Sequence, residues 1–141
     1  MITLKVFGNP APQGSKRVFQ GRVVEASGQK LKVWRKAIAA ACQNLLSEEH
    51  SLLLGPVRVE VDFYLPRPSS VSVKKRPLPI VPPDVDKLAR ACLDGLGQGF
   101  DTGKVGDGIL FGDDSQVTEL VARKFYADDR EPGATIRIFA L

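Results

Sequence analysis

The chain has 141 residues, of which 43% are hydrophobic and 26% are charged, and its formal net charge is +4. This composition excludes a disordered chain and a coiled coil, and the length fits one domain over residues 1–141. No apolar run approaches the ~20 residues that a membrane helix needs, and two separated cysteines in helical patterns exclude a secreted disulfide scaffold, so we expect a cytoplasmic protein that does not bind membranes.

The first half of the chain predicts a strand, a hairpin and a helix. Alternating apolar residues predict a strand over residues 2–7, and a loop rich in glycine and proline follows at 8–15. A hairpin with Gly21 near its turn comes next. Residues 28–49 predict a helix, because apolar residues recur there at spacings of three and four. They are Leu31, Trp34, Ile38, Cys42 and Leu45.

The middle of the chain combines a strand, a loop and a helix. Strict alternation over residues 57–65 predicts a half-buried strand. Residues 66–83 contain six prolines and several cations, which favours an extended loop. A second helix is expected over residues 84–96. The segment 95–112 holds seven glycines, and we expect it to be mobile.

Two closing strands complete the pattern, over residues 117–125 and 135–141. Strands and helices are thus mixed along the chain without an internal repeat or a linker between domains. The sequence predicts a single α+β domain, in which helices pack on a mixed β-sheet.

Aspartates are grouped at two places in the second half of the chain. Asp84 and Asp86 follow two prolines at the expected helix start, and Asp113 and Asp114 precede the strand at residue 117. Carboxylates directed into one cleft suit Mg²⁺ or Mn²⁺, which prefer hard oxygen ligands. The alternative is that Asp84 caps the helix, Asp86 stabilises its positive end, and the second pair forms a solvated turn.

Two cations share the helix with the first aspartate pair. Arg90 is four residues after Asp86, so both side chains lie on one helix face. A cation there can stabilise charge on a phosphate in the transition state, although an ordinary ion pair explains the same spacing. Lys87, next to Asp86, is the alternative candidate for this role.

Several other site types are excluded. Gly103 and Lys104 lack the spacing of a phosphate-binding P-loop, so no nucleotide cofactor is expected. A single histidine and two separated cysteines do not make a typical structural zinc site. Ser15 has no histidine partner for a hydrolase triad.

Charge is divided unevenly along the chain. Residues 1–83 hold 13 Lys or Arg against 5 Asp or Glu, a balance of +8, whereas residues 84–141 hold 7 against 11, a balance of −4. A solvated charged surface explains these counts. They also suit a metal-dependent nuclease, whose basic part binds phosphates and whose acidic part binds the metal.

Three runs of residues occur in one order along the chain. They are Gly8–Arg17, then Pro83–Leu88 with Arg90, Ala91 and Asp94 after it, then Asp113–Val117. Together they resemble the RusA family of Holliday-junction resolvases. The resemblance implies a homodimeric, metal-dependent endonuclease that nicks two opposed strands of a four-way DNA junction in recombination and repair.

The resemblance also implies roles for individual residues. Asp84, Asp86 and Asp114 match the family's metal-binding aspartates, with Mg²⁺ expected and Mn²⁺ as the second option. The position of the family's catalytic lysine holds Arg90, which keeps the charge but presents a planar fork, so Lys87 stays an alternative. Cations expected to contact phosphates of the junction arms are Lys16, Arg17, Arg35, Lys36, Lys74, Lys75 and Arg76.

Two other functions fit the same residues. The first is a DNA-binding protein that holds junctions or duplexes without cutting them, with its aspartates acting as caps and turn residues. The second is a nuclease with the same metal site but other branched substrates, such as flaps or replication forks.

Overall fold

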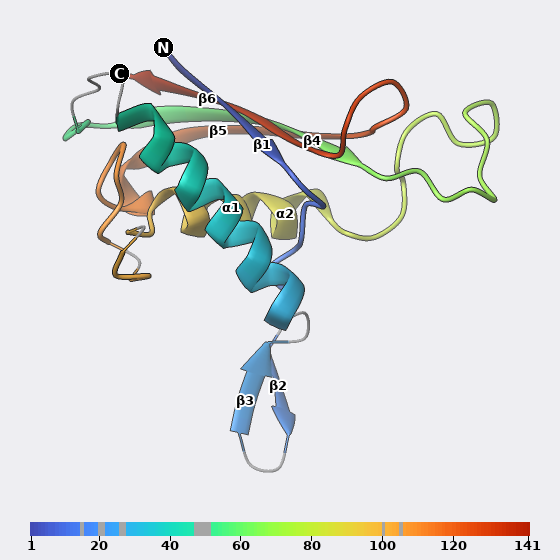
Figure 1. The fold of residues 1–141 in the computed structure, drawn as a ribbon, viewed down its shortest axis with the longest axis horizontal. Coiled ribbons are helices and arrows are strands. Elements are labelled where there is room, and N and C mark those ends of the chain that lie inside the picture. Colours follow the sequence, from blue (N-terminus) through green and yellow to red (C-terminus); the bar gives the residue numbers. More distant parts are fainter. Residues whose placement is uncertain (15, 20–21, 26–27, 47–51, 100, 105) are drawn as a thin grey trace.

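Two helices cover one face of a four-stranded sheet, and a small hairpin projects away from them (Figure 1). This arrangement is seen in a computed structural model, which describes all residues except 15, 20, 21, 26, 27, 47–51, 100 and 105. The elements are β1 (Ile2–Phe7), β2 (Lys16–Phe19), β3 (Arg22–Glu25), α1 (Gly28–Leu46), β4 (Val57–Leu65), α2 (Val85–Leu96), the single-turn 3-10 helix η1 (Asp114–Gln116), β5 (Val117–Tyr126) and β6 (Gly133–Ala140).

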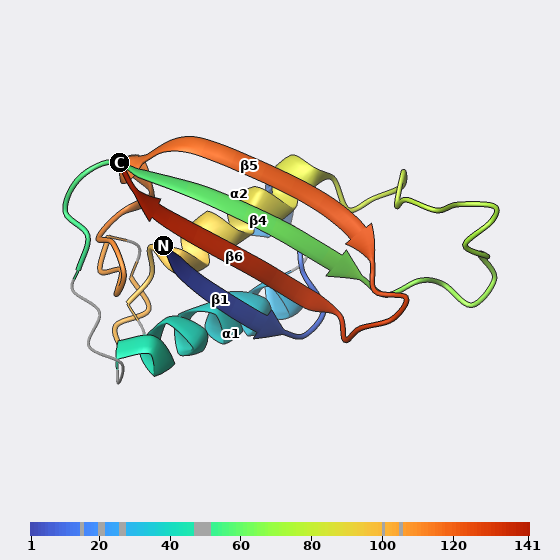
Figure 2. The ribbon, with the colours of Figure 1, turned by 90° about the horizontal axis from the view of Figure 1, so that it is seen from above.

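The sheet has the strand order β1-β6-β4-β5 (Figure 2). β4 runs parallel to β5 and antiparallel to β6, which in turn runs antiparallel to β1. Strands β2 and β3 form a separate antiparallel hairpin. The predicted α+β fold with a mixed sheet is therefore confirmed.

The core lies between the sheet and the helices, as the sequence periodicity predicts. Val57, Val59, Val61 and Phe63 of β4 are at most 1% exposed, so alternate residues of this strand face the helices. The stripe of α1 that begins at Leu31 is buried against them, and so is the predicted stripe of α2. No helix in the described part of the chain is long and apolar enough to cross a membrane.

The face of the sheet opposite the helices carries paired charges together with aromatic rings such as Tyr64 and Phe125. Asp62 of β4 is only 7% exposed, but Arg123 donates a hydrogen bond to it at 2.8 Å and Arg137 donates another at 3.3 Å. Buried charges require such partners, so these carboxylate oxygens are already satisfied. This face therefore supports the fold and leaves the candidate site to the helical side.

The glycine-rich segment after α2 is attached to the core. This differs from the predicted mobile loop. Leu110 and Phe111 are at most 1% exposed, and the Leu53 backbone N–H donates to the Leu110 carbonyl at 2.8 Å. A Cβ added to Gly108 would lie 2.0 Å from the Phe111 carbonyl oxygen, so this close backbone approach requires glycine. Glycine at this position allows the backbone to turn tightly, so that η1 lies beside the C-terminal end of α2.

Candidate active site

The N-terminal end of α2 carries the first aspartate pair. Asp84 occupies the N-cap position, but its side chain makes no capping hydrogen bond. Its carboxylate is about half exposed and lies 3.5 Å from the ammonium of Lys87. Asp86 is exposed in the first turn of the helix. Helix capping therefore does not account for the Asp84 carboxylate, which is available to a ligand.

The C-terminal end of α2 carries a second acidic pair. Asp94 lies in the last turns of the helix, and its carboxyl group is hydrogen-bonded to that of Asp114 in η1. Burial raises the pKa of Asp114 above its usual value, and the charges of Asp113 and Asp94 and this hydrogen bond raise it further. Interacting carboxyl groups of this kind favour a shared proton, or a cation that replaces it.

The neighbouring aspartate has a structural role instead. Asp113 is the N-cap of η1 and accepts a hydrogen bond from the Ser115 backbone N–H at 3.1 Å. This bond and a second one from the Ser115 hydroxyl lower the pKa of Asp113. Gln116 completes a capping box, since its side-chain oxygen accepts from the Asp113 backbone N–H at 3.1 Å. Of this pair, Asp113 therefore serves as the cap of η1, whereas Asp114 interacts with Asp94.

The predicted metal ligands Asp84, Asp86 and Asp114 are divided between the two ends of α2. Asp86 and Asp94 are eight residues apart, which corresponds to about 12 Å along a helix axis. Among the described residues, no group of three acidic, histidine or cysteine side chains gathers closely enough to hold an ion. Their assignment as one ligand set stays a prediction.

Asp94 is the acidic residue that the predicted ligand set lacks. It lies four residues beyond Arg90, which itself lies four residues beyond Asp86, so the three side chains follow one face of α2. That spacing was a signal available in the sequence. The contact with Asp114 was not, because it depends on the path of the glycine-rich segment.

Arg90 is exposed between the two acidic pairs. It forms no ion pair with any described residue, whereas Lys87 is within reach of Asp84. The guanidinium of Arg90 is thus free to meet an anionic ligand along this face of α2. This difference favours Arg90 over Lys87 as the cation that acts on a phosphate.

Arg35 of α1 is partly engaged within the protein. Its guanidinium lies 3.7 Å from the Asp94 carboxylate and donates a long hydrogen bond of 3.5 Å to Gln13. Gln13 is buried, and its backbone N–H donates to the Lys87 carbonyl at 3.0 Å. The loop before β2 thereby connects α1 to α2, and Arg35 positions Asp94 as well as presenting charge.

A basic hollow of about 270 Å³ opens beside this ion pair. Lys32, Arg35 and Lys36 line it from α1, and residues 98 and 101–103 line it from the segment after α2. Two of the predicted phosphate contacts, Arg35 and Lys36, therefore lie next to the acidic pair at the C-terminal end of α2.

The remaining predicted DNA contacts are on two protruding segments (Figure 1). Lys74 and Lys75 are exposed on the proline-rich loop, and Arg76 donates to the Tyr126 hydroxyl at 3.4 Å. Lys16 and Arg17 belong to the β2–β3 hairpin, and their side chains lie outside the described part of the structure.

Arg67 orders the proline-rich loop, and sequence analysis did not single it out. It donates two hydrogen bonds to Asp128, at 2.6 and 3.0 Å, and others to loop carbonyls, including that of Arg76 at 2.6 Å. Its guanidinium also stacks 4.0 Å from the centre of the Tyr126 ring. These contacts hold the loop against the sheet where it leads into α2.

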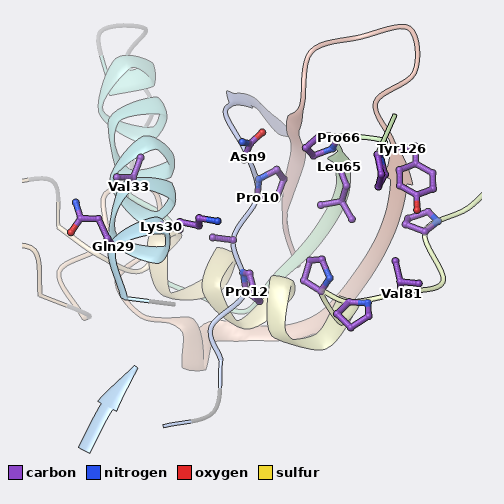
Figure 3. Close-up of a pocket in the computed structure, with 15 residues that line it drawn as sticks. Asn9, Pro10, Pro12, Gln29, Lys30, Val33, Leu65, Pro66, Val81 and Tyr126 are labelled. Atoms are coloured by element: carbon purple, nitrogen blue, oxygen red, sulfur yellow. The ribbon is translucent and has the colours of Figure 1, made fainter. Parts of the chain in front are cut away.

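A larger apolar pocket of about 770 Å³ adjoins the N-terminal end of α2 (Figure 3). Pro82 and Pro83 form part of its wall, directly before Asp84. The ammonium of Lys124 fixes this wall, because it donates to the carbonyls of Val81 and Pro83 at 2.9 Å each. The first aspartate pair thus follows a wall that is tied to β5.

Comparison with known proteins identifies the family. A family model described as "Endodeoxyribonuclease RusA" matches residues 8–139. The chain belongs to the RusA family. It is also similar to "Uncharacterized protein YqaN" of Bacillus subtilis (strain 168), with 29% identity over 150 residues that cover 96% of this chain and 95% of the relative. The resemblance of the three sequence runs is therefore confirmed, and membership implies endodeoxyribonuclease activity with DNA as the substrate.

Proposed function

We propose that this RusA family member resolves four-way (Holliday) DNA junctions by paired, symmetric nicks in a metal-dependent reaction. The observation that carries the proposal is the exposed face of α2, on which Arg90, which has no ion pair with a described residue, lies between two aspartate pairs. A basic hollow adjoins one of these pairs. Phosphate contacts from such cations give affinity and orientation, with little base specificity.

Different residues of the chain bind the DNA phosphates and stabilise the reacting phosphate. Lys32 and Lys36 bind backbone phosphates at the hollow, and the loop cations Lys74 and Lys75 bind a junction arm. Arg90 donates hydrogen bonds to the phosphate under attack, where negative charge grows in the transition state. Because a guanidinium stays protonated throughout the physiological pH range, it acts here by charge and not by proton transfer.

The donor chemistry of the site fits a divalent ion. Hard cations prefer carboxylate oxygen donors, which are present at both ends of α2. Asp84 and Asp86 would serve Mg²⁺, or Mn²⁺ in its place, at the N-terminal end, and Asp114 with Asp94 would serve such an ion at the C-terminal end, since these carboxylates do not gather around one point in the described structure. Burial raises the pKa of Asp114, and the charges of Asp113 and Asp94 raise it further, so a bound cation would relieve part of this cost of ionisation. A bound divalent ion supplies Lewis-acid polarisation of the scissile phosphate.

A homodimer matches this substrate. A four-way junction presents two symmetry-related strands, and a two-fold dimer presents two identical sites to them. Paired nicking then requires two chains bound to one junction.

The decisive experiment is cleavage of a synthetic four-way junction in Mg²⁺ by the wild-type chain and by Asp86→Asn. Glu119→Gln is the matched control, because Glu119 is an exposed acid on β5 outside the candidate site. We expect symmetric paired nicks from the wild type and the control. Asp86→Asn should bind the junction with unchanged or improved affinity and fail to cut it.

A linear duplex, a flap and a replication fork complete the substrate set. Cleavage that persists in Asp86→Asn would remove this carboxylate from the reaction. Equal rates on flaps or forks would replace junction resolution with a broader branched-DNA activity. Tight binding without cutting in every variant would leave a DNA-binding protein.

A further inference from the structure

We infer that the apolar pocket beside the N-terminal end of α2 receives one unstacked base of the DNA substrate during cleavage. The inference rests on the proposed function, which it extends by assigning a base-binding site. Three observations support it: the residues that line the pocket, the charge of that lining, and the position of the pocket beside Asp84.

Several separate segments build the pocket (Figure 3). Residues 9–12 of the first loop lie between the start of α1, which contributes Lys30 and Val33, and the proline-rich loop, which contributes residues 79 and 81–83. The end of β4 and Tyr126 of β5 complete the wall. Its volume of about 770 Å³ lies within the ~300–1,000 Å³ of typical small-ligand sites, so one nucleotide fits it.

The lining suits a flat apolar group. Seven of its residues are prolines, whose rings are rigid and whose backbones carry no N–H that would be left without a partner. Such a surface is organised before binding, so little conformational freedom is lost when a ring packs on it. The side-chain amides of Asn9 and Gln29 add polar atoms at the pocket, which can bond the edge of a base.

The charge of the pocket favours an anionic ligand. Of the described residues that line it, Lys30 is basic and none is acidic. A ligand that combines a flat apolar ring with negative charge is a nucleotide. DNA, which family membership implies as the substrate, supplies that chemistry.

The position of the pocket connects it to cleavage. Pro82 and Pro83 form its wall and Asp84 follows directly, while Lys124 holds the carbonyls of Val81 and Pro83. In Figure 1 the β2–β3 hairpin projects below the start of α1 and the proline-rich loop projects to the right of the sheet, and both segments carry predicted phosphate contacts. Unstacking a base costs least where pairing is already disturbed, as at a branch point. A junction crossover therefore offers the base that this pocket can take.

The test uses a four-way junction with 2-aminopurine, a fluorescent adenine analogue, at the crossover. Fluorescence is read with wild-type protein in EDTA, and cleavage is read separately in Mg²⁺. The blocking variant is Val33→Trp, because Val33 lines the pocket and its side chain is 61% exposed, so a larger residue enters the pocket without disturbing the core. Val73→Trp is the matched control, on an exposed loop position that does not line the pocket.

We expect 2-aminopurine fluorescence to rise when the wild type or Val73→Trp binds, and not when Val33→Trp binds. Cleavage by Val33→Trp should slow by ~10-fold or more, the equivalent of losing one stacked base, while its junction affinity stays within ~3-fold of the wild type. Lys30→Gln, which keeps the fold and removes only the charge, should reduce the fluorescence rise partially.

Two results would overturn the base pocket. One is a wild-type chain that cuts junctions without any rise in fluorescence. The other is a change of Val33→Trp from dimer to monomer in sedimentation, which would assign the pocket to a second copy of the chain. A wild-type chain that binds but cuts no branched DNA would instead refute the proposed function, so the two failures are distinguishable.

Discussion

The two ends of α2 carry the same residue type in different surroundings. At the N-terminal end, Asp84 and Asp86 are exposed, and a proline wall tied to Lys124 precedes them. At the C-terminal end, the Asp94 side chain is 16% exposed and shares a hydrogen bond with Asp114, which arrives from a distant part of the sequence. One end is organised by local sequence, and the other by a tertiary contact.

This difference indicates a division of tasks within one site. Exposed carboxylates beside a large pocket remain accessible to a bulky ligand. In a partly covered carboxyl pair, the repulsion between the two ionised groups favours a cation. Arg90 lies about one turn from Asp86 and one turn from Asp94, so a phosphate bound to its guanidinium would lie near both carboxylates.

The largest expected effect on cleavage comes from Asp114, and its neighbour Asp113 should have almost none. Asp114→Asn should lower junction cleavage by ~10²–10³-fold or more, because it removes an oxygen donor proposed for the divalent ion. Asp113→Asn should retain near-wild-type cleavage, since asparagine also accepts the capping hydrogen bond from Ser115. Single-turnover rates in Mg²⁺ measure both. Equal losses in the two variants would mean that η1 as a whole, and not the Asp114 carboxylate, supports activity.

An intermediate effect is expected for the cation between the two ends. Arg90→Ala should slow cleavage by ~10–100-fold, because a charge-assisted contact to the phosphate is lost. Lys87→Ala should change the rate by less than ~5-fold, since an exposed ion pair such as that with Asp84 contributes little. Arg90→Lys tests whether the planar fork or only the charge is needed. If Lys87→Ala is the more damaging variant, the assignment of the two cations is reversed.

Periodicity predicted those parts of the fold that depend on neighbouring residues. The alternation of β4 and the apolar stripe of α2 follow from burial of one face, so the sequence alone was sufficient to place them. The same holds for the exposed acids at the start of α2, because helix geometry determines which side chains share a face.

Contacts that join distant segments could not be predicted in this way. The interaction of Asp94 with Asp114 requires the segment between them to fold back onto the core. Leu110 and Phe111 attach this segment to the core, but the surrounding glycines give no periodic pattern that would predict their burial. Lys124 and Arg67 donate hydrogen bonds to backbone carbonyls of the proline-rich loop. Every residue has a backbone carbonyl, so the sequence does not show which carbonyls accept these bonds. The family resemblance predicts Asp84, Asp86 and Asp114 as metal ligands, which stays a prediction, and it does not say which aspartates contact one another.

The smallest expected effect concerns the loop that forms the wall at the N-terminal end. Arg67 donates to Asp128, and this hydrogen bond lowers the pKa of the Asp128 carboxyl. An aspartate with a lowered pKa in the folded chain stabilises that chain above the unfolded-state value of about 3.9, and the contribution is lost as the pH falls through the lowered pKa. Asp128→Asn should therefore have a slightly lower Tm than the wild type at pH 7, and the gap should close in strong acid. Tm measured for both chains from pH 7 to pH 2 provides the comparison. A gap that persists unchanged at pH 2 would mean that the contribution of Asp128 does not depend on its ionisation, and the absence of a gap at pH 7 would mean that Arg67 holds the loop through its carbonyl contacts alone.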